Sequence, residues 1–334
     1  MHRPRPTLEN VARHAGVSRA TVSRVVNGST KVGEESRDAV LRSIQELGYI
    51  PNQAARSLVT QRTDSFALVL PEEPGRVFSD DQFFPGVVRG VSQQLEAADK
   101  QLVLMMARSP ASRDRIERFA QARHVDGVMV ASMHGADPLP PALAGMGIPV
   151  VCNERVPGPA SLPYVGVDNV VGATLAVEHL VRTGRTRIVT VAGPQDMVAG
   201  IDRLAGYRAA LGEAGLESAV AAGDFTQESG AVAMRDLLDR EPRLDAVFVA
   251  SDPMAIGVLR ALRQAGRRVP DDVAVVGFDD IETARYTEPP LTTVRQPIAE
   301  LGRQLARQLL RLTAGEDIEP ALVLPTELVV RESA

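Results

Sequence analysis

The segment Arg19–Val26, RATVSRVV, combines side chains that can hydrogen-bond to nucleic acid bases with side chains that need burial. Arginine can present two parallel N–H donors to the O6 and N7 atoms of guanine, and the segment contains Arg19 and Arg24. Ala20 can offer only a methyl contact, for instance to thymine. On a helix, the three valines fall on one side and leave these residues on the other. A short helix of this kind suits the major groove of DNA.

The elements before this segment would position it as the second helix of a pair. Thr7 is a favoured N-cap, and apolar residues recur at helical spacing over 8–15. Gly16 allows the left-handed backbone of a tight turn, after which Ser18 can cap the next helix. The sequence therefore predicts one helix over about 8–15 and a second over about 19–26.

A third helix is predicted from about Glu34 to Leu47. It would bury Val40, Ile44 and Leu47 and stop at Gly48. Three short helices with a glycine-containing turn between the first two make a helix-turn-helix domain.

Charge is distributed unevenly along the chain, although the net charge is only -5. Residues 1–62 contain ten arginines and lysines against five acids, a net charge of +5, which leaves -10 for the remainder. Positive charge gathers phosphate and releases its counterions, so the basic region indicates a polyanionic partner. A basic solvated face without any partner would carry the same charge.

The rest of the chain alternates short apolar runs with stretches of helical pattern, which predicts parallel sheets covered by helices. The runs are FALVLP (66–71), LVLMM (102–106), GVMVA (127–131), IPVVC (148–152), RIVTVAG (187–193), AVFVAS (246–251) and VAVVGFDD (273–280). We expect two lobes of this doubly wound α/β type, because 334 residues exceed what one hydrophobic core usually supports. Ligands of such sheets bind beyond the carboxyl ends of the strands, so the cleft between the lobes is the expected binding site.

The loop after the first predicted strand carries residue types that suit a sugar ring. It ends in SDDQFFPG, with Asp80 and Asp81 before Phe83 and Phe84. Aromatic faces stack on the C–H groups of a sugar, and carboxylates accept hydrogen bonds from its hydroxyls. An alternative interpretation places Phe83 in a contact between two copies of the chain.

Several function classes leave no signal in the sequence. No apolar run approaches the roughly 20 residues that span a bilayer, and no signal-like stretch begins the chain, so we expect a cytoplasmic protein. Cys152 is the single cysteine, which excludes an intrachain disulfide and a cysteine-based zinc site, and its flanks predict a buried strand. GxGxxG after the first strand, GxSxG and the Walker loop are absent, and the five histidines are dispersed. We therefore expect neither catalysis nor a cofactor or bound metal.

The motifs TLENVARHAGVSRATVSRVVNG and KVGEESRDAVLRSIQELGYIPNQAARSL, nearly continuous over residues 7–58, resemble the lactose/galactose repressor (LacI/GalR) family of bacterial transcriptional regulators. Gly33 departs from the family's serine N-cap, and because glycine is itself an acceptable cap we expect only a slightly weaker third helix. The resemblance implies a helix-turn-helix domain (1–50), a hinge helix and linker (51–62) and an effector-binding and dimerisation domain (63–334). In that last domain it implies a sensor like a periplasmic binding protein, with one lobe from 63–163 and 293–322 and the other from 164–290 and 323–334.

For DNA binding, the resemblance assigns the base-reading positions to Arg19, Ala20 and Arg24. The positions that hold phosphates and fix the register are Thr7, Ser18, Thr21, Ser23 and Asn27. In the hinge PNQAARSLV the resemblance implies DNA contacts by Asn52, Ala55 and Leu58. Leu58 would act as a wedge that enters the minor groove and kinks the duplex. Two alternatives stay open: Arg24 paired with an acid of the third helix, and Leu58 packed on the core.

For the effector, the proposed cleft residues are Asp81, Phe83, Phe84, Arg203, Phe225, Asp252, Asp279 and Gln296. Arg203, Phe225 and Asp279 match a sugar-binding arginine, an aromatic wall and a hydroxyl-binding carboxylate of the family, whereas Asp252 has an alternative role as a helix cap. Met197 and Ser251 differ from the residue types of a lactose-type pocket. The segments VFSDDQFFPG and IDRLAGY are similar to those of family members that respond to cellobiose and cello-oligosaccharides.

The resemblance therefore predicts a repressor of carbohydrate-utilisation genes that is relieved by a sugar, best matched by cellobiose or a cello-oligosaccharide. It would bind a palindromic operator as a homodimer, and the lack of a leucine-heptad segment after the last strand argues against a tetramer. The alternatives are a sugar-binding protein of the transport type, which would lack the DNA-binding head, and a regulator of a non-sugar ligand such as a nucleobase.

Overall fold

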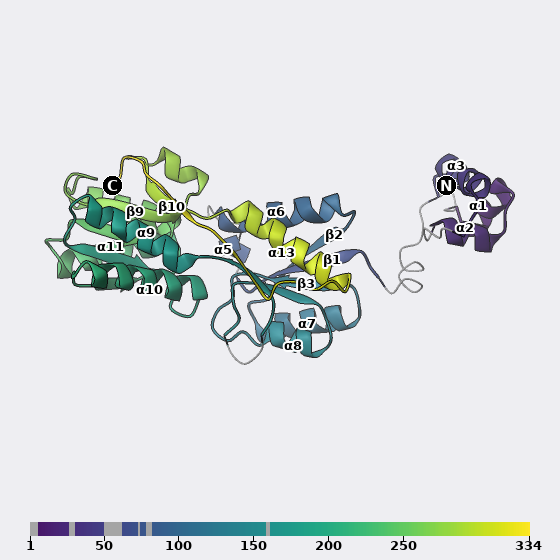
Figure 1. Cartoon of the computed structure of the whole chain (residues 1–334), viewed down its shortest axis with the longest axis horizontal. Coiled ribbons are helices and arrows are strands. Elements are labelled where there is room, and N and C mark those ends of the chain that lie inside the picture. The colour runs from purple at the N-terminus through teal and green to yellow at the C-terminus, as the bar shows by residue number, and fades with distance from the viewer. Residues whose placement is uncertain (1–5, 27–30, 50–61, 73, 78–81, 158–160) are drawn as a thin grey trace. The chain divides into compact units, whose positions relative to one another are not determined.

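The computed structural model describes residues 6–26, 31–49, 62–72, 74–77, 82–157 and 161–334. The chain divides into two units, Met1–Thr63 and Asp64–Ala334, whose elements are labelled in Figure 1. Within the described ranges, no helix is long and apolar enough to cross a membrane.

The N-terminal unit contains the three predicted helices, α1 (Leu8–Ala15), α2 (Arg19–Val26) and α3 (Glu34–Leu47). Thr7 caps α1: its hydroxyl accepts a hydrogen bond from the Asn10 backbone N–H (3.3 Å), and the Asn10 side chain accepts one from the Thr7 N–H (2.9 Å). Gly16 ends α1 with a φ of 67°, the left-handed conformation that the turn requires. The helix-turn-helix prediction is confirmed.

One small apolar core joins these helices. Val11 on α1, Val22 on α2 and Val40 on α3 are fully buried in it. Gly33 supplies no side-chain hydrogen bond to the start of α3, so this helix lacks the cap that a serine would provide.

The second unit consists of two lobes, each built on one sheet of strands in the described part of the chain. The first sheet has the order β11-β5-β4-β3-β1-β2 and is parallel throughout. Its strands are β1 (Ser65–Leu70), β2 (Gln101–Met106), β3 (Gly127–Val130), β4 (Val150–Asn153), β5 (Tyr164–Val167) and β11 (Ala321–Leu324). The second sheet has the order β12-β10-β9-β8-β6-β7, with β12 antiparallel to β10. Its strands are β6 (Ile188–Ala192), β7 (Ala219–Ala222), β8 (Ala246–Val249), β9 (Ala274–Asp279), β10 (Thr292–Arg295) and β12 (Glu327–Val329).

Helices cover both faces of each sheet (Figure 1). Those of the first lobe are α5 (Pro74–Val77), α6 (Phe83–Ala97), α7 (Pro110–Gln121), α8 (Leu139–Gly145) and α13 (Ile298–Thr313). Those of the second are α9 (Asn169–Arg182), α10 (Val198–Glu213), α11 (Gln227–Arg240), α12 (Asp252–Gln264) and the 3₁₀ helix η1 (Glu282–Tyr286). Along β1, Phe66 and Leu68 enter the core under α6 and α13, whereas Ala67 and Val69 enter the core under α7 and α8. Burial on both faces explains why the strand lacks polar alternation, and the doubly wound prediction is confirmed.

The predicted strands are all present, with ends within two residues of the predicted ones. The sequence patterns did not reveal the strands β5, β7, β10, β11 and β12, and the predicted lobe limits are wrong at three of these: they place β5 and the end of β11 in the second lobe and most of β10 in the first. β5 pairs with β4 and β11 in the first sheet, and β10 pairs with β9 in the second. The chain therefore first crosses from one lobe to the other after Val167, and it crosses back after Arg295. Strands of three or four residues carry no local signal for the sheet they join, because that choice depends on distant partners.

Candidate functional site

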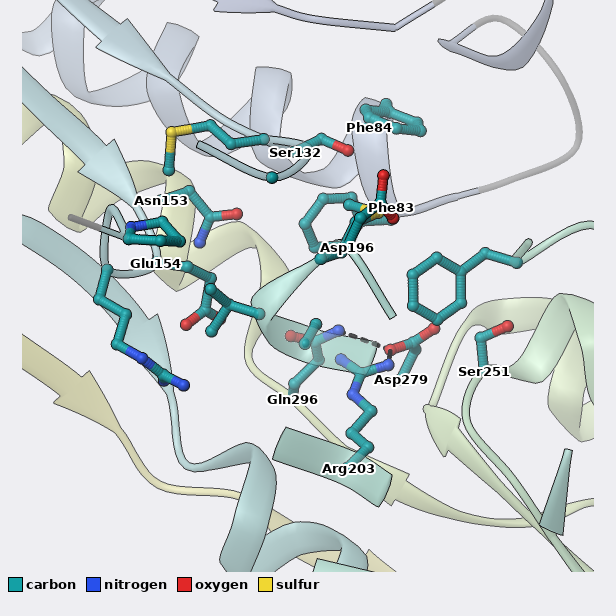
Figure 2. A pocket seen from close by; sticks show the side chains of 18 of the residues that line it. Phe83, Phe84, Ser132, Asn153, Glu154, Asp196, Arg203, Ser251, Asp279 and Gln296 are labelled. Carbon is teal, nitrogen blue, oxygen red and sulfur yellow. Dashed lines mark hydrogen bonds and ion pairs between the residues drawn. The ribbon is translucent and has the colours of Figure 1, made fainter. Parts of the chain in front are cut away.

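A pocket lies between the two lobes, at the carboxyl ends of their strands (Figure 2). Its space is about 790 Å³ when the open mouth is included. In each sheet the strand order reverses beside the first strand of the lobe, which is β1 in the first sheet and β6 in the second. Open α/β sheets bind their ligands at the point where the strand order reverses. The lining includes Phe83, Phe84, Ser132, Asn153 and Glu154 from the first lobe, Asp196, Arg203, Phe225, Ser251 and Asp279 from the second, and Gln296 from the segment that crosses between them after β10.

Arg203 on α10 forms the buried floor of this pocket, with only 4% of its surface exposed. Its Nε donates to Asn169 Oδ1 (2.9 Å), and its Nη1 donates to the Ala250 carbonyl (2.6 Å) and to Asp279 Oδ1 (3.2 Å). The guanidinium also lies 3.7 Å from the ring centroid of Phe278. Burial lowers the pKa of Arg203 and Asp279 opposes the shift, but a guanidinium remains charged. The cation is therefore fixed in place before any ligand arrives.

Asp279, at the end of β9, is the acceptor around which this floor is organised (Figure 2). Besides Arg203, the Gln296 amide donates to its Oδ1 at 2.6 Å. Its φ of 116° is one that side-chain-bearing residues rarely adopt, so the backbone is strained at this strand end. Positive φ recurs at the pocket residues Ser132, Glu154 and Phe225. Strain that collects around one cavity is typical of a functional site.

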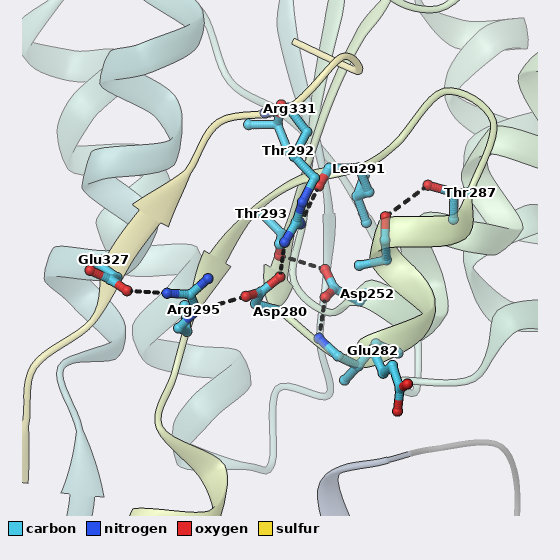
Figure 3. A network of polar contacts seen from close by, with 12 residues as sticks. Asp252, Asp280, Glu282, Thr287, Leu291, Thr292, Thr293, Arg295, Glu327 and Arg331 are labelled. Atoms are coloured by element: carbon cyan, nitrogen blue, oxygen red, sulfur yellow. Dashed lines mark hydrogen bonds and ion pairs between the residues drawn. The ribbon is translucent and has the colours of Figure 1, made fainter.

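Asp280, the residue after Asp279, is hydrogen-bonded by two arginines (Figure 3). The buried Asp280 carboxylate accepts hydrogen bonds from Arg295 Nε (2.7 Å) and Arg331 Nη2 (2.5 Å). Arg295, on β10, donates in addition to Glu327 on β12 (2.5 Å). Because neighbouring segments hold Asp280 from two directions, the strained turn that presents Asp279 is kept in place.

Aromatic rings supply the apolar walls of the pocket. Phe225 has a φ of 70°, and its ring lies 2.5 Å from where a Cβ at Gly193 would be, so a larger residue at position 193 would displace the ring. The Arg203 guanidinium carbon is 5.9 Å from the Phe225 ring centroid. Phe83 and Phe84 meet edge to face, with centroids 5.5 Å apart. Faces and edges of this kind stack against the C–H groups of a sugar.

The sequence analysis missed several polar residues of the pocket, among them Ser132, Asn153, Glu154 and Asp196. Glu154 Oε1 accepts a hydrogen bond from Asn169 Nδ2 (3.1 Å), and burial raises the pKa of Glu154 to about 7, against the effect of Arg203. The sequence did contain a signal for these four residues, because each follows a buried apolar run. Asn153 and Glu154, for example, come directly after the run IPVVC.

Two of the predicted effector residues do not belong to the described pocket lining. Asp252 is fully buried at the start of α12 and points away: it accepts from the Ile281 N–H (3.0 Å) and the Thr293 hydroxyl (2.6 Å), as Figure 3 shows. It therefore fastens β10 and the segment after β9 to α12, and Ser251 is the N-cap. The prediction for Asp252 as a ligand contact is wrong, since a carboxylate after a strand can serve the backbone as well as a ligand. Asp81 lies outside the described residues.

The proposed base-reading residues lie on the exposed side of α2 in the N-terminal unit. Arg19, Ala20 and Arg24 are exposed, whereas Val22 points into the core. Arg19 Nε lies 3.0 Å from a carboxylate oxygen of Glu9 on α1, with both side chains more than half exposed. Among the described residues no ion pair joins Arg24 to α3, so nothing there supports the alternative role for Arg24.

Three of the proposed phosphate contacts, Thr7, Ser18 and Thr21, lie at helix N-termini. Thr7 caps α1, and the Ser18 hydroxyl accepts from the Thr21 N–H (3.1 Å) at the start of α2. Ser23 is half-buried on α2. Exposed N–H groups and short hydroxyl side chains are common phosphate ligands. The remaining proposed DNA contacts, Asn27, Asn52, Ala55 and Leu58, lie outside the described residues.

Both units of the chain are similar to known proteins. Residues 7–52 match the model of the bacterial regulatory proteins of the lacI family, and residues 177–334 match that of the periplasmic binding protein-like domain. The chain is 51% identical to the HTH-type transcriptional regulator CelR of Thermobifida fusca, over 99% of both chains. The chain belongs to the LacI family. It is also 36% identical to the ribose operon repressor of Escherichia coli (strain K12), over 98% of this chain and 99% of that protein.

Solved structures of the LacI family resemble the whole chain. A transcriptional regulator CelR–cellobiose complex matches with a TM-score of 0.78 and 49% identity, over 99% of this chain and 100% of that one. A lac repressor dimer bound to operator and the anti-inducer ONPF matches with a TM-score of 0.86 and 29% identity, over 99% of both. As a LacI-family member, the chain is a DNA-binding transcriptional regulator with a helix-turn-helix head and a two-lobed sensor, and the relatives named above are transcriptional regulators as well.

Proposed function

We propose that this LacI-family regulator represses carbohydrate-utilisation genes, and that cellobiose or a cello-oligosaccharide in the inter-lobe pocket releases it from DNA. The observation that carries the proposal is one pocket in which Arg203, Asp279 and Gln296 lie among aromatic walls. Charged and amide groups exchange hydrogen bonds with sugar hydroxyls, and aromatic rings cover the C–H faces. A solved complex of a 49% identical chain contains cellobiose, which supports the same ligand class here.

The proposed effector contacts follow from this geometry. They are Phe83, Phe84, Asn153, Glu154, Arg203, Phe225, Asp279 and Gln296. The pocket combines a charged floor with aromatic walls, an arrangement suited to a ring with polar edges and apolar faces.

On the DNA side, Arg19, Ala20 and Arg24 read bases from α2. Thr7, Ser18, Thr21, Ser23 and Asn27 hold phosphates, and Asn52, Ala55 and Leu58 of a hinge at 51–62 enter the minor groove. The chain acts as a cytoplasmic homodimer on a palindromic operator and catalyses no reaction. A lac repressor dimer on its operator, similar over 99% of the chain, supports this arrangement.

The decisive experiment measures sugar binding and operator release together. Calorimetry with cellobiose, cellotriose and ribose would rank the ligands, and ribose is the comparison because the relatives include ribose operon repressors. Fluorescence anisotropy on an operator selected from a random DNA library would then follow release. We expect cellobiose or cellotriose to bind and to weaken operator affinity, and ribose to do neither. Tighter binding of ribose, or operator affinity unchanged by any of the sugars, would refute the proposal.

A further inference from the structure

His134 lies at the edge of the pocket, where the two lobes meet. It occupies the loop between β3 and α8, and its neighbours Met133 and Gly135 both line the pocket. None of the roles proposed above uses this histidine, although it contacts a residue of the other lobe.

The two ring nitrogens of His134 face carboxylates from different lobes. Nδ1 is 2.9 Å from Asp196 Oδ2, in the loop after β6 of the second lobe, and Nε2 is 3.2 Å from Glu72 Oε1, just after β1 of the first. A second contact crosses the cleft beside them, since the Gly135 N–H donates to the Asp196 carbonyl at 2.6 Å. Asp196, which lines the pocket, is thus held by the first lobe through its backbone and its side chain.

The protonation state of His134 decides whether both side-chain contacts can form. A neutral imidazole has one N–H, so it can donate to only one of two carboxylates, whereas the protonated ring donates to both. Glu72 is 4% exposed and also accepts from the Ser132 hydroxyl (2.7 Å). The hydrogen bond to Glu72 raises the pKa of His134 and the one to Asp196 adds to the shift, while burial opposes it.

Among the described residues, the charged groups that face the ring are Glu72 and Asp196, from the loops on either side of the cleft. The nearest acid of its own loop, Asp137, lies with its carboxylate 3.4 Å from Arg113 on α7 and accepts from the Leu139 N–H. Both groups that face His134 therefore favour the protonated ring.

We propose that His134 is a positioning residue of the sensor, which takes up a proton as the lobes close and then clamps Asp196 at the pocket. The proposal rests on the function proposed above, because a sensor whose lobes close on a sugar has an open arrangement in which His134 and Asp196 separate. Only the closed arrangement offers His134 both carboxylates.

The sign of the pH dependence follows from linkage. A histidine whose pKa is higher in the closed arrangement stabilises that arrangement fully below its ordinary pKa, and the stabilisation is lost as pH rises through the raised pKa. Closure and sugar affinity therefore decrease from pH 6 to pH 8.5. The size of the change is set by the difference in the His134 pKa between the two arrangements, since each unit of difference corresponds to a tenfold change in the equilibrium.

The test compares His134→Gln with His124→Gln, which changes an exposed histidine of the same lobe that stacks on Phe119. Spin labels on Arg115→Cys of α7 and Ala209→Cys of α10, both exposed, report the distance between the lobes without any sugar. Calorimetry then gives cellobiose affinity across the same pH range.

In the unmodified and His124→Gln proteins we expect the closed population and the cellobiose affinity to fall about threefold to tenfold from pH 6 to pH 8.5. In His134→Gln the closed population should be nearly constant, and the pH dependence that remains in the cellobiose affinity should be that of the pocket residue Glu154, whose pKa burial raises to about 7. Equal pH profiles for the two variants, or a closed population that does not respond to pH in the unmodified protein, would overturn the proposal. If cellobiose fails to bind at every pH, the proposed effector is wrong, and the sugar-free label distances still decide the role of His134.

Discussion

The head and the pocket are built in opposite ways, although arginine is central to both. In the head, Arg19 and Arg24 lie exposed within one helix of eight residues. In the pocket, Arg203 is buried and held by groups from distant parts of the chain. If the exposed arginines contact DNA as proposed, they become ordered on binding, whereas the buried one is held by the protein itself.

This difference predicts different costs of mutation. Removing an exposed arginine should change binding and leave folding unaffected. Removing the buried one should change folding and binding together, because its partners are left without a counter-charge. Each prediction below tests one side of this comparison.

The largest effect is expected for Arg203→Ala. Breaking a buried ion pair costs about 3–5 kcal/mol, here because Asp279 would stay buried without its cation. Urea unfolding should show this loss, and the folded fraction should still bind the operator but no longer release it on adding sugar. Arg208→Ala, at an exposed position of the same helix, is the control. If Arg203→Ala keeps its stability and its sugar affinity, the buried arginine is not the anchor of the pocket.

A second, smaller effect concerns pH and Glu154. Burial raises the pKa of Glu154 to about 7, so its protonated form stabilises the fold fully below about pH 4.5, and that contribution is lost as pH rises to about 7. The free energy of unfolding should fall by about 2–3 kcal/mol across this interval. Glu154→Gln should flatten that part of the profile, measured by denaturant unfolding at several pH values. If the pH profile of the variant is unaltered, a residue other than Glu154 causes the pH dependence of the free energy of unfolding.

In the head, Arg24→Ala should weaken binding to the best operator by about 1–3 kcal/mol and relax the preference at one base pair per half-site. Unfolding free energy and cellobiose affinity should not change, because Arg24 is exposed. Binding to a randomised operator library measures the preference. A uniform loss across all sequences would reassign Arg24 to a phosphate.

The smallest effects concern the helix caps. Thr7→Ala should destabilise α1 by about 1 kcal/mol, since it removes the acceptor of the Asn10 N–H. Gly33→Ser should stabilise α3 by a few tenths of a kcal/mol, roughly the difference between these caps, and no atom lies within 4 Å of the new Cβ. Amide hydrogen exchange of the whole chain separates the two helices. A stabilising effect of Thr7→Ala would contradict the capping geometry.

The same difference explains what the sequence could predict. The head was predictable to the residue at its helix ends, because Thr7, Gly16 and Gly48 act on their own neighbours. The pocket was predictable where a family motif marked it, as for Arg203 and Asp279, and where aromatic residues ended the loop after a predicted strand, as for Phe83 and Phe84. Glu154 and Asn153 carried no motif, and their role depends on strand β4 lying beside strands that are distant in sequence.

Asp252 illustrates a limit of the same kind. Asp252 follows a buried strand, and Asp279 ends one. The local sequences, SD and FDD, both place a carboxylate at the end of a strand. One carboxylate points at Arg203 and the other at Thr293 and a backbone N–H. The direction is set by tertiary contacts, which a pattern of residue types does not contain.

The order of the strands also has a consequence for synthesis on the ribosome. The head is complete once Tyr49 has emerged, but the first sheet needs β11, and α13 covers its core. Since the second lobe is translated in between, neither lobe can finish before residue 324. At about 5–20 residues per second, the DNA-binding helices precede the finished sensor by roughly 15–55 seconds. The DNA-binding helices are therefore complete during synthesis before the two lobes that bind the effector.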